Sequence, residues 1–143
     1  MGNRIINAVG IWFFAKNTQR YLYLMRNDFK YPQHWGLPGG KIEKNEALLD
    51  TIVRECEEEM GYMPSYTKLV PLEQYISNDD RFCYHTFFCL LDNEFFPDLN
   101  HEHIGYAWIN KDIIPKPLHP GLWATLKIED IYEKIKTVEE LYA

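Results

Sequence analysis

Cysteine is scarce in this sequence, with three residues, Cys56, Cys83 and Cys89, and no Cys-X-X-Cys pair. An odd count without paired spacing gives no disulfide framework of the kind that stabilises small secreted domains. We therefore expect reduced, mostly structural thiols in a cytoplasmic protein.

Long apolar runs are missing as well. The longest one near the start, Ala8–Ala15, is interrupted by Gly10. It is far shorter than the roughly 20 residues that a membrane-spanning helix requires. A signal peptide is not recognisable either, so the sequence predicts no membrane association.

Cations are outnumbered by anions, with 15 Lys and Arg residues against 21 Asp and Glu residues and a formal net charge of -6. This balance disfavours binding to the phosphate backbone of a DNA duplex. A small phosphate substrate remains compatible with it, because a bound divalent cation can invert the local charge.

What the sequence does contain is ordinary for a globular protein. It has 143 residues, of which 46% are hydrophobic and 25% charged, and no repeat or low-complexity tract is visible. This length and balance predict one compact domain that spans residues 1–143.

Alternating apolar residues and turn-forming residues predict several short strands. The first part of the chain is expected to form strands at 5–15 and 21–26 around a turn at 16–19, a loop at 27–35 and irregular backbone at 36–40. The second part is expected to form strands at 66–77, 82–92 and 105–110, a loop at 115–121 and a closing helix at 122–141. This order predicts an α/β (mixed α+β) fold, in which a mixed β-sheet packs between helices.

A central helix is predicted from Glu46 to Met60, where the period of the apolar residues changes. The apolar positions recur at helical spacing, at Leu49, Ile52, Val53, Cys56 and Met60. Asn45 is a suitable N-cap for this helix, and Gly61 is a suitable residue for its end.

The most specific motif overlaps this helix. Gly40 is followed after five residues by Glu46, and after seven more by the run Arg54-Glu55-Cys56-Glu57-Glu58-Glu59-Met60-Gly61-Tyr62. This pattern resembles the Nudix box, GX5EX7REUXEEXGU, in which U is a bulky apolar residue. Every fixed letter is present. Cys56 and Tyr62 stand where an aliphatic residue is usual, and a buried cysteine behaves as a small hydrophobe.

The spacing of the acidic residues favours a metal site. At ~100° per residue, Glu55, Glu58 and Glu59 fall within roughly a 100° arc of the helix. Like charges at these spacings destabilise a helix, and the carboxyl end of the helix dipole adds to the penalty. A hard divalent cation removes the repulsion. The alternative is a solvated acidic face.

The resemblance implies a metal-dependent hydrolase. It implies that Glu55, Glu58 and Glu59 hold Mg²⁺, or Mn²⁺ in its place, and that Glu55 also serves in catalysis. A backbone carbonyl of the preceding glycine-rich loop joins the metal site in the family, and by position this is Gly39. Arg54 and Glu46 match family positions that orient the carboxylates. For Arg54 the alternative is a surface ion pair with Glu58.

Several candidates for substrate binding and catalysis lie outside the helix. Arg26, at the end of the second strand, and Lys41 could reach a substrate phosphate. Gly40 lets the backbone approach a phosphate closely. Glu102 precedes Trp108 by six residues, which is similar to the family pattern of a loop glutamate that acts as extra ligand or general base.

Other residues near these candidates receive weaker predictions. Glu94 and Asp98 are rivals of Glu102, and His101 and His103 are expected on a loop surface. One of the aromatic residues could stack on a nucleobase, although core packing is the commoner role; they are Tyr31, Trp35, Phe82, Tyr84 and Trp108.

The function that the resemblance implies is hydrolysis of a diphosphate linkage in a small nucleotide, a nucleoside diphosphate linked to another group. (Deoxy)nucleoside triphosphates, including oxidised ones, are favoured. ADP-ribose, dinucleoside polyphosphates and capped RNA remain alternatives, although Ile76-Ser77 stands where many ADP-ribose hydrolases have a proline. A non-catalytic nucleotide sensor and a metal-binding interaction module are the alternatives from other classes. A homodimer is left open.

Overall fold

The structure is a computed structural model that describes residues 5–143 of the chain. Its strands are β1 (Ile6–Ala15), β2 (Arg20–Arg26), β3 (Trp35–Gly36), β4 (Gly39–Lys41), β5 (Lys68–Ile76), β6 (Phe82–Leu91) and β7 (His103–Asn110). They form one sheet in the order β3-β2-β1-β6-β5, in which β4 also pairs with β1 and β7 with β2. Strands β1 and β6 run parallel, whereas the other pairs are antiparallel. The mixed sheet is confirmed.

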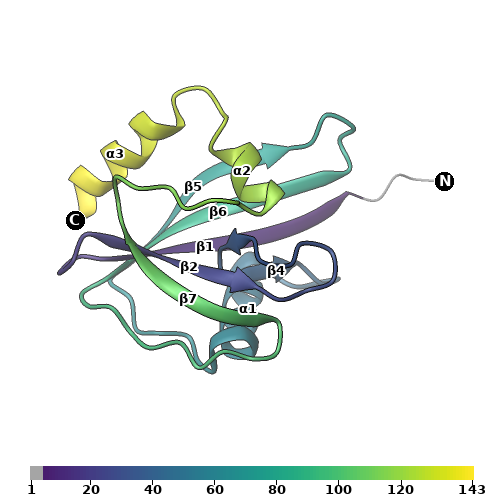
Figure 1. Ribbon diagram of the computed structural model, residues 1–143. Coiled ribbons are helices and arrows are strands. Elements are labelled where there is room, and N and C mark those ends of the chain that lie inside the picture. Colours follow the sequence, from purple (N-terminus) through teal and green to yellow (C-terminus); the bar gives the residue numbers. More distant parts are fainter. Residues whose placement is uncertain (1–4) are drawn as a thin grey trace.

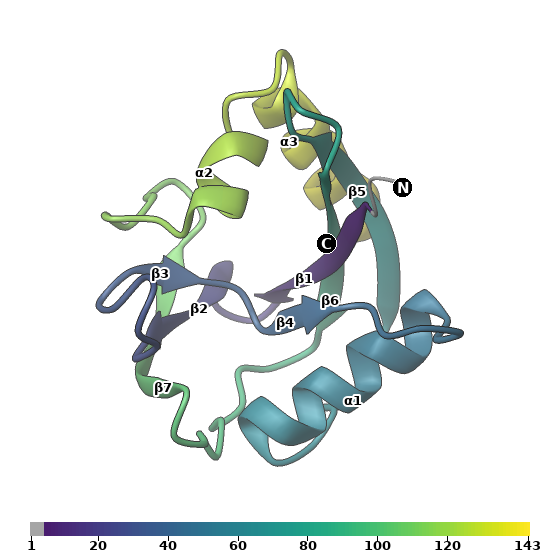
Figure 2. The ribbon, with the colours of Figure 1, turned by 90° about the vertical axis from the view of Figure 1, so that its right-hand side faces the viewer.

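Helices cover the sheet from two sides (Figures 1 and 2). Helix α1 (Leu48–Met60) lies on one side, and α2 (Pro120–Thr125) and α3 (Ile131–Tyr142) lie on the other. The predicted fold class, a mixed sheet between helices, is therefore confirmed. Within residues 5–143, no helix is both long enough and apolar enough to cross a membrane.

The core is divided between the two faces of the sheet, and β1 contributes to both. Val9, Ile11 and Phe13 belong to the cluster that packs with α1, whereas Trp12 and Phe14 belong to the cluster that packs with α2 and α3. Successive side chains of a strand point to opposite faces. A strand covered on both faces is therefore apolar at nearly every position.

Helix α1 begins at Leu48 rather than at the predicted Glu46. The predicted N-cap, Asn45, is wrong, because Asn45 adopts a left-handed conformation (φ 65°) and Ala47 takes the capping position without a side-chain hydrogen bond. The predicted end is confirmed: Gly61 has φ 84°, and its N–H donates to the carbonyl of Glu57. Cys56 and Met60 are buried, but Leu49 in the first turn is 50% exposed.

Ile52→Ala is expected to lower the free energy of unfolding by about 2–5 kcal/mol, because it leaves a cavity in the core. Ile52 is 1% exposed in the cluster beneath α1. Leu49→Ala on the same helix is the matched control and should cost much less, since Leu49 is half exposed. Chemical denaturation of both variants measures the difference, and equal losses would contradict the placement of α1.

Two expected segments differ from the structure. The closing helix predicted at 122–141 is two helices, α2 and α3, separated by a turn in which Asp130 has φ 63°. The backbone at 36–40, expected to be irregular, contains the last residue of β3 and the first two residues of β4. Strand β4 lies so close to β1 that a Cβ on Gly39 would be 2.0 Å from the carbonyl oxygen of Val9. A glycine is therefore required there.

Candidate active site

The candidate site forms where β4 passes over α1. A Cβ built on Gly40 would lie 2.6 Å from the carboxyl carbon of Glu55. The missing side chain at Gly40 therefore leaves the space that the Glu55 carboxylate occupies. This contact explains in physical terms why the motif needs a glycine before the helix.

Glu59 lies deeper than a solvated acidic face would place it. Its side chain is 4% exposed, and its Oε2 accepts a hydrogen bond of 2.9 Å from the N–H of Gly39. Burial raises the pKa of Glu59 well above its ordinary value, and the charges of Glu55 and Glu102 raise this pKa further. Burial also raises the pKa of Glu55. The two carboxylates therefore share a site that favours an added positive charge.

Arg54 joins the carboxylates at the edge of this site. Its Nε lies 2.7 Å from Oε2 of Glu46, and its Nη1 lies 2.8 Å from Oε1 of Glu55. Nη2 donates to the carbonyl of Lys41 at 3.1 Å. The hydrogen bond from Arg54 is the main cause that lowers the pKa of Glu46 to about 2. Arg54 therefore links the loop, β4 and α1.

Glu58 and Glu102 are less enclosed. The Glu58 side chain is 54% exposed and lies 3.4 Å from Arg54, which is a weaker contact than those to Glu46 and Glu55. Glu102 is exposed on the loop before β7, where its backbone N–H donates to Asn100. Within the described range 5–143, no three His, Cys, Asp or Glu side chains form a ready-made metal-binding cluster.

The donors that lie together nevertheless fit a divalent cation. Glu55 and Glu59 offer carboxylate oxygens, the donors that Mg²⁺ and Ca²⁺ prefer. Gly40 leaves the space in which the Glu55 carboxylate lies. Arg54 holds Glu55 from one side, and the Gly39 N–H holds Glu59 from another. Both anchors restrict the carboxylates while leaving oxygens for a ligand.

A pocket of about 170 Å³ opens next to these carboxylates. The pocket is lined by the three predicted substrate-binding residues, Arg26, Gly40 and Lys41, and by Gly39, the predicted backbone ligand of the metal. Its other lining residues are Ala8, Val9, Leu37, Phe82, Tyr84 and His119. The volume is below the ~300–1,000 Å³ of pockets that enclose a whole ligand. It therefore suits one part of a larger substrate.

Aromatic rings form one side of this pocket. Phe82 and Tyr84 stack with centroids 6.1 Å apart, and Tyr84 and His119 lie 6.5 Å apart. On β1, Gly10 makes room for Tyr84, because a Cβ there would lie 2.0 Å from the Tyr84 hydroxyl. Arg26 is held by Asp28 through contacts of 3.0 and 2.8 Å. The arrangement suits a planar group with a phosphate nearby.

The model of a protein family described as "NUDIX domain" matches residues 5–127 of the chain. The chain belongs to the Nudix family. The Nudix hydrolases that it resembles include nucleoside triphosphatase NudI of Escherichia coli O17:K52:H18, which is 27% identical over 132 residues, 81% of this chain and 92% of that protein. Nudix hydrolase 3 of Arabidopsis thaliana is 34% identical over 82 residues, which is 52% of this chain but only 11% of that protein.

Solved structures show the same fold. The crystal structure of a MutT protein from Methanosarcina mazei Go1 superposes with a TM-score of 0.69 at 21% sequence identity, covering 96% of this chain and 97% of that one. This likeness shows the fold. The family match and the similarity to nucleoside triphosphatase NudI confirm that the chain is a Nudix hydrolase.

His119 is a pocket residue of this Nudix domain that the sequence analysis missed. It precedes α2, and its Nδ1 accepts a hydrogen bond of 3.2 Å from the N–H of Gly121. Burial, followed by the charge of Arg26, lowers the pKa of His119 to about 4. The ring is therefore neutral at pH 7. A His-Pro-Gly sequence before an apolar segment was the only local signal.

His119→Asn is expected to make stability less sensitive to acid. Unfolding restores the ordinary pKa near 6.5, so the unfolded state binds more protons between about pH 6.5 and 4, and stability falls as the pH falls. Asn keeps an acceptor for Gly121. Between pH 7 and 4 the variant should lose about 2–3 kcal/mol less than the wild type. Denaturation at both pH values tests this, and an unchanged pH dependence would contradict it.

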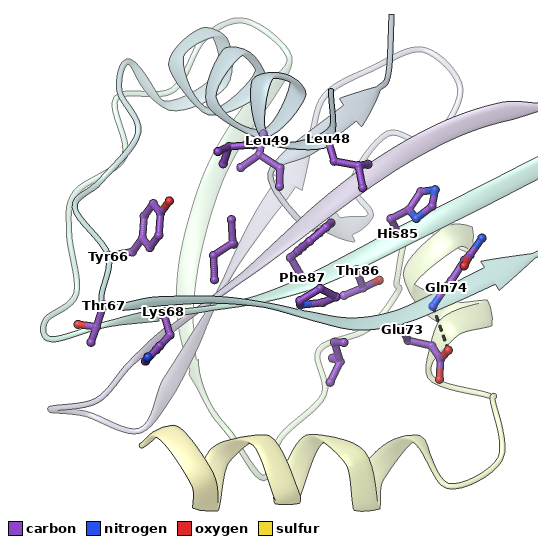
Figure 3. A pocket seen from close by; sticks show the side chains of 14 residues that line it. Leu48, Leu49, Tyr66, Thr67, Lys68, Glu73, Gln74, His85, Thr86 and Phe87 are labelled. Atoms are coloured by element: carbon purple, nitrogen blue, oxygen red, sulfur yellow. Dashed lines mark hydrogen bonds between the residues drawn. The ribbon is translucent and has the colours of Figure 1, made fainter. Parts of the chain in front are cut away.

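A larger cavity of this Nudix domain, about 680 Å³, lies elsewhere (Figure 3). It is a groove between the start of α1 and the strands β5 and β6, and Leu48, Leu49, Tyr66 and Phe87 line it. Glu73 is the carboxylate there, and it pairs with Lys134 of α3. The groove therefore has one carboxylate and no cluster of them, unlike the candidate site where β4 passes over α1.

Proposed function

We propose that this Nudix hydrolase uses Mg²⁺, with Mn²⁺ as a substitute, to cleave the diphosphate linkage of a nucleoside diphosphate joined to another group. The observation that carries the proposal is that Glu55 lies against Gly40 and Glu59 is bonded to Gly39, while both glycines line a pocket that also contains Arg26 and aromatic rings. Phosphoryl chemistry needs positioning and charge neutralisation more than covalent help from the protein.

The residues divide this work between them. Glu55, Glu58 and Glu59 would hold the cation with the carbonyl of Gly39, and Arg54 and Glu46 would keep Glu55 in place. When bound, the cation supplies neutralisation of the phosphate charge and a lowered pKa for water. Arg26 and Lys41 line the pocket and would bind phosphate oxygens, and Gly40 would let the substrate approach the backbone.

Two carboxylates, those of Glu55 and Glu102, are candidates to accept the proton of the attacking water. Glu55 is enclosed, and burial raises its pKa, which strengthens it as a base. Glu102 is exposed on the loop before β7, close enough for its charge to raise the pKa of Glu59.

The substrate class that we favour is the (deoxy)nucleoside triphosphates, including oxidised ones. The E. coli relative that is similar over 92% of its own length is named a nucleoside triphosphatase. The rings of Phe82, Tyr84 and His119 would contact the base, while Arg26 and Lys41 would contact the phosphates.

A panel of nucleotides with Mg²⁺ tests this proposal. The panel should contain the common and oxidised nucleoside triphosphates, ADP-ribose, dinucleoside polyphosphates and capped RNA, with products identified by mass. We expect a nucleoside monophosphate and pyrophosphate from one or more triphosphates. Turnover confined to another class would correct the substrate, and binding without turnover of any compound would instead favour a nucleotide sensor.

A further inference from the structure

His103 is the buried histidine next to the candidate metal site. It is the first residue of β7, where a surface loop was expected, and its side chain is 4% exposed. Its Nε2 lies 3.6 Å from Oε1 of Glu59, so a small rotation brings the two atoms into hydrogen-bond contact. Its Nδ1 is buried and has no hydrogen-bond partner among the described residues.

The two oxygens of the Glu59 carboxylate face different strands. The N–H of Gly39 on β4 donates to Oε2, while His103 on β7 faces Oε1. Two donors from two strands would fix the plane of the carboxylate. A metal ligand held this way keeps its remaining lone pairs aimed at the ion.

A purely structural role does not explain the choice of residue. An apolar side chain would fill the same space without leaving a buried nitrogen unpartnered, which is unfavourable. Arg26 on β2 lies opposite His103 on β7. Its guanidinium is bonded to Asp28 and not to the His103 ring. The feature that His103 adds is a donor directed at Glu59.

We propose that His103 is a positioning residue that orients Glu59 for the divalent cation, by donating a hydrogen bond from Nε2 to Oε1 of that carboxylate. This inference rests on the proposed function. It predicts that the site loses metal affinity when the donor is removed and keeps it when another side chain supplies a donor at the same place.

Binding of Mn²⁺ alone, followed by electron paramagnetic resonance of the free ion, tests the inference on the full chain. His103→Leu removes the donor and should weaken Mn²⁺ binding by about 10–100-fold, the usual effect of losing such a partner. His103→Gln places an amide nitrogen near the position of Nε2 and should bind Mn²⁺ much as the wild type does. Melting temperatures show whether each variant is folded.

Nitrogen NMR of the imidazoles of the wild-type chain supplies a second readout, for which a folded variant is needed only to assign the signal. His103, assigned by the signal that His103→Gln lacks, should carry its proton on Nε2, and its nitrogen shifts should move when Mg²⁺ is added. A proton on Nδ1, or shifts insensitive to Mg²⁺, would overturn the inference.

The remaining outcomes are decisive in the same way. Equal Mn²⁺ affinity of the wild type and His103→Leu overturns the role of His103 and leaves the metal site intact. Equal loss in folded His103→Leu and His103→Gln also overturns it, because the donor is then not what matters. A wild-type chain that binds no Mn²⁺ overturns the proposed function together with this inference.

Discussion

Removal of divalent cations with a chelator is expected to abolish turnover without unfolding the protein. The carboxylates of Glu55 and Glu59 lack a cation to neutralise the substrate phosphates once the metal is gone. The fold does not depend on it, because Ile52, Cys56 and Met60 anchor α1 on the sheet through a separate apolar face. Turnover and melting temperature, each measured in excess EDTA, give the two readouts.

Restoring the cation provides the control for this prediction. Added Mg²⁺ should recover the full rate and raise the melting temperature, because a ligand that binds only the folded state stabilises it. Full turnover in EDTA, from protein shown by elemental analysis to contain no metal, would contradict the proposed chemistry.

Glu59→Gln is expected to lower turnover by at least ~100-fold in saturating Mg²⁺. Several kcal/mol of charge stabilisation depend on the ligands, and about 1.4 kcal/mol corresponds to a tenfold change in rate. In EDTA the same variant should be as stable as the wild type or more stable. The reason is that burial and the charge of Glu55 make an ionised Glu59 unfavourable in the folded state.

Glu57→Gln is the matched control, since Glu57 is exposed on the same helix and is not among the proposed ligands. Its turnover should equal that of the wild type. If Glu59→Gln melted early yet kept its turnover, Glu59 would be a structural residue and the assignment of the metal site would be wrong.

Much of the candidate site could be predicted from the sequence, because the residues of the motif from Gly40 to Tyr62 have a fixed spacing. Glu46 and Arg54 are eight residues apart and bond to each other, and Arg54 also bonds to the carbonyl of Lys41 on β4. Gly40, on the same strand, makes room for Glu55. The helical period also predicted that Ile52 and Met60 would be buried. These are local relations, which one segment of the chain determines.

The parts that sequence analysis missed depend on tertiary packing. The helical arc predicted that Glu55, Glu58 and Glu59 lie on one side of α1. It could not predict that Glu59 is buried against β4 while Glu58 is exposed to solvent. His103 and His119 reach the site from β7 and from the residue before α2, so no spacing relative to the motif could indicate them. The break between α2 and α3 likewise depends on Asp130 in a left-handed turn.

The most direct test of the central claim is to locate the cation in a crystal soaked with Mn²⁺, by the anomalous scattering of the metal. We predict a peak between the carboxylates of Glu55 and Glu59, beside Gly40 and within direct coordination distance of oxygen, and no such peak in crystals of Glu59→Gln. An active protein whose Mn²⁺ peak lies away from these carboxylates, or persists unchanged in Glu59→Gln, would contradict the account.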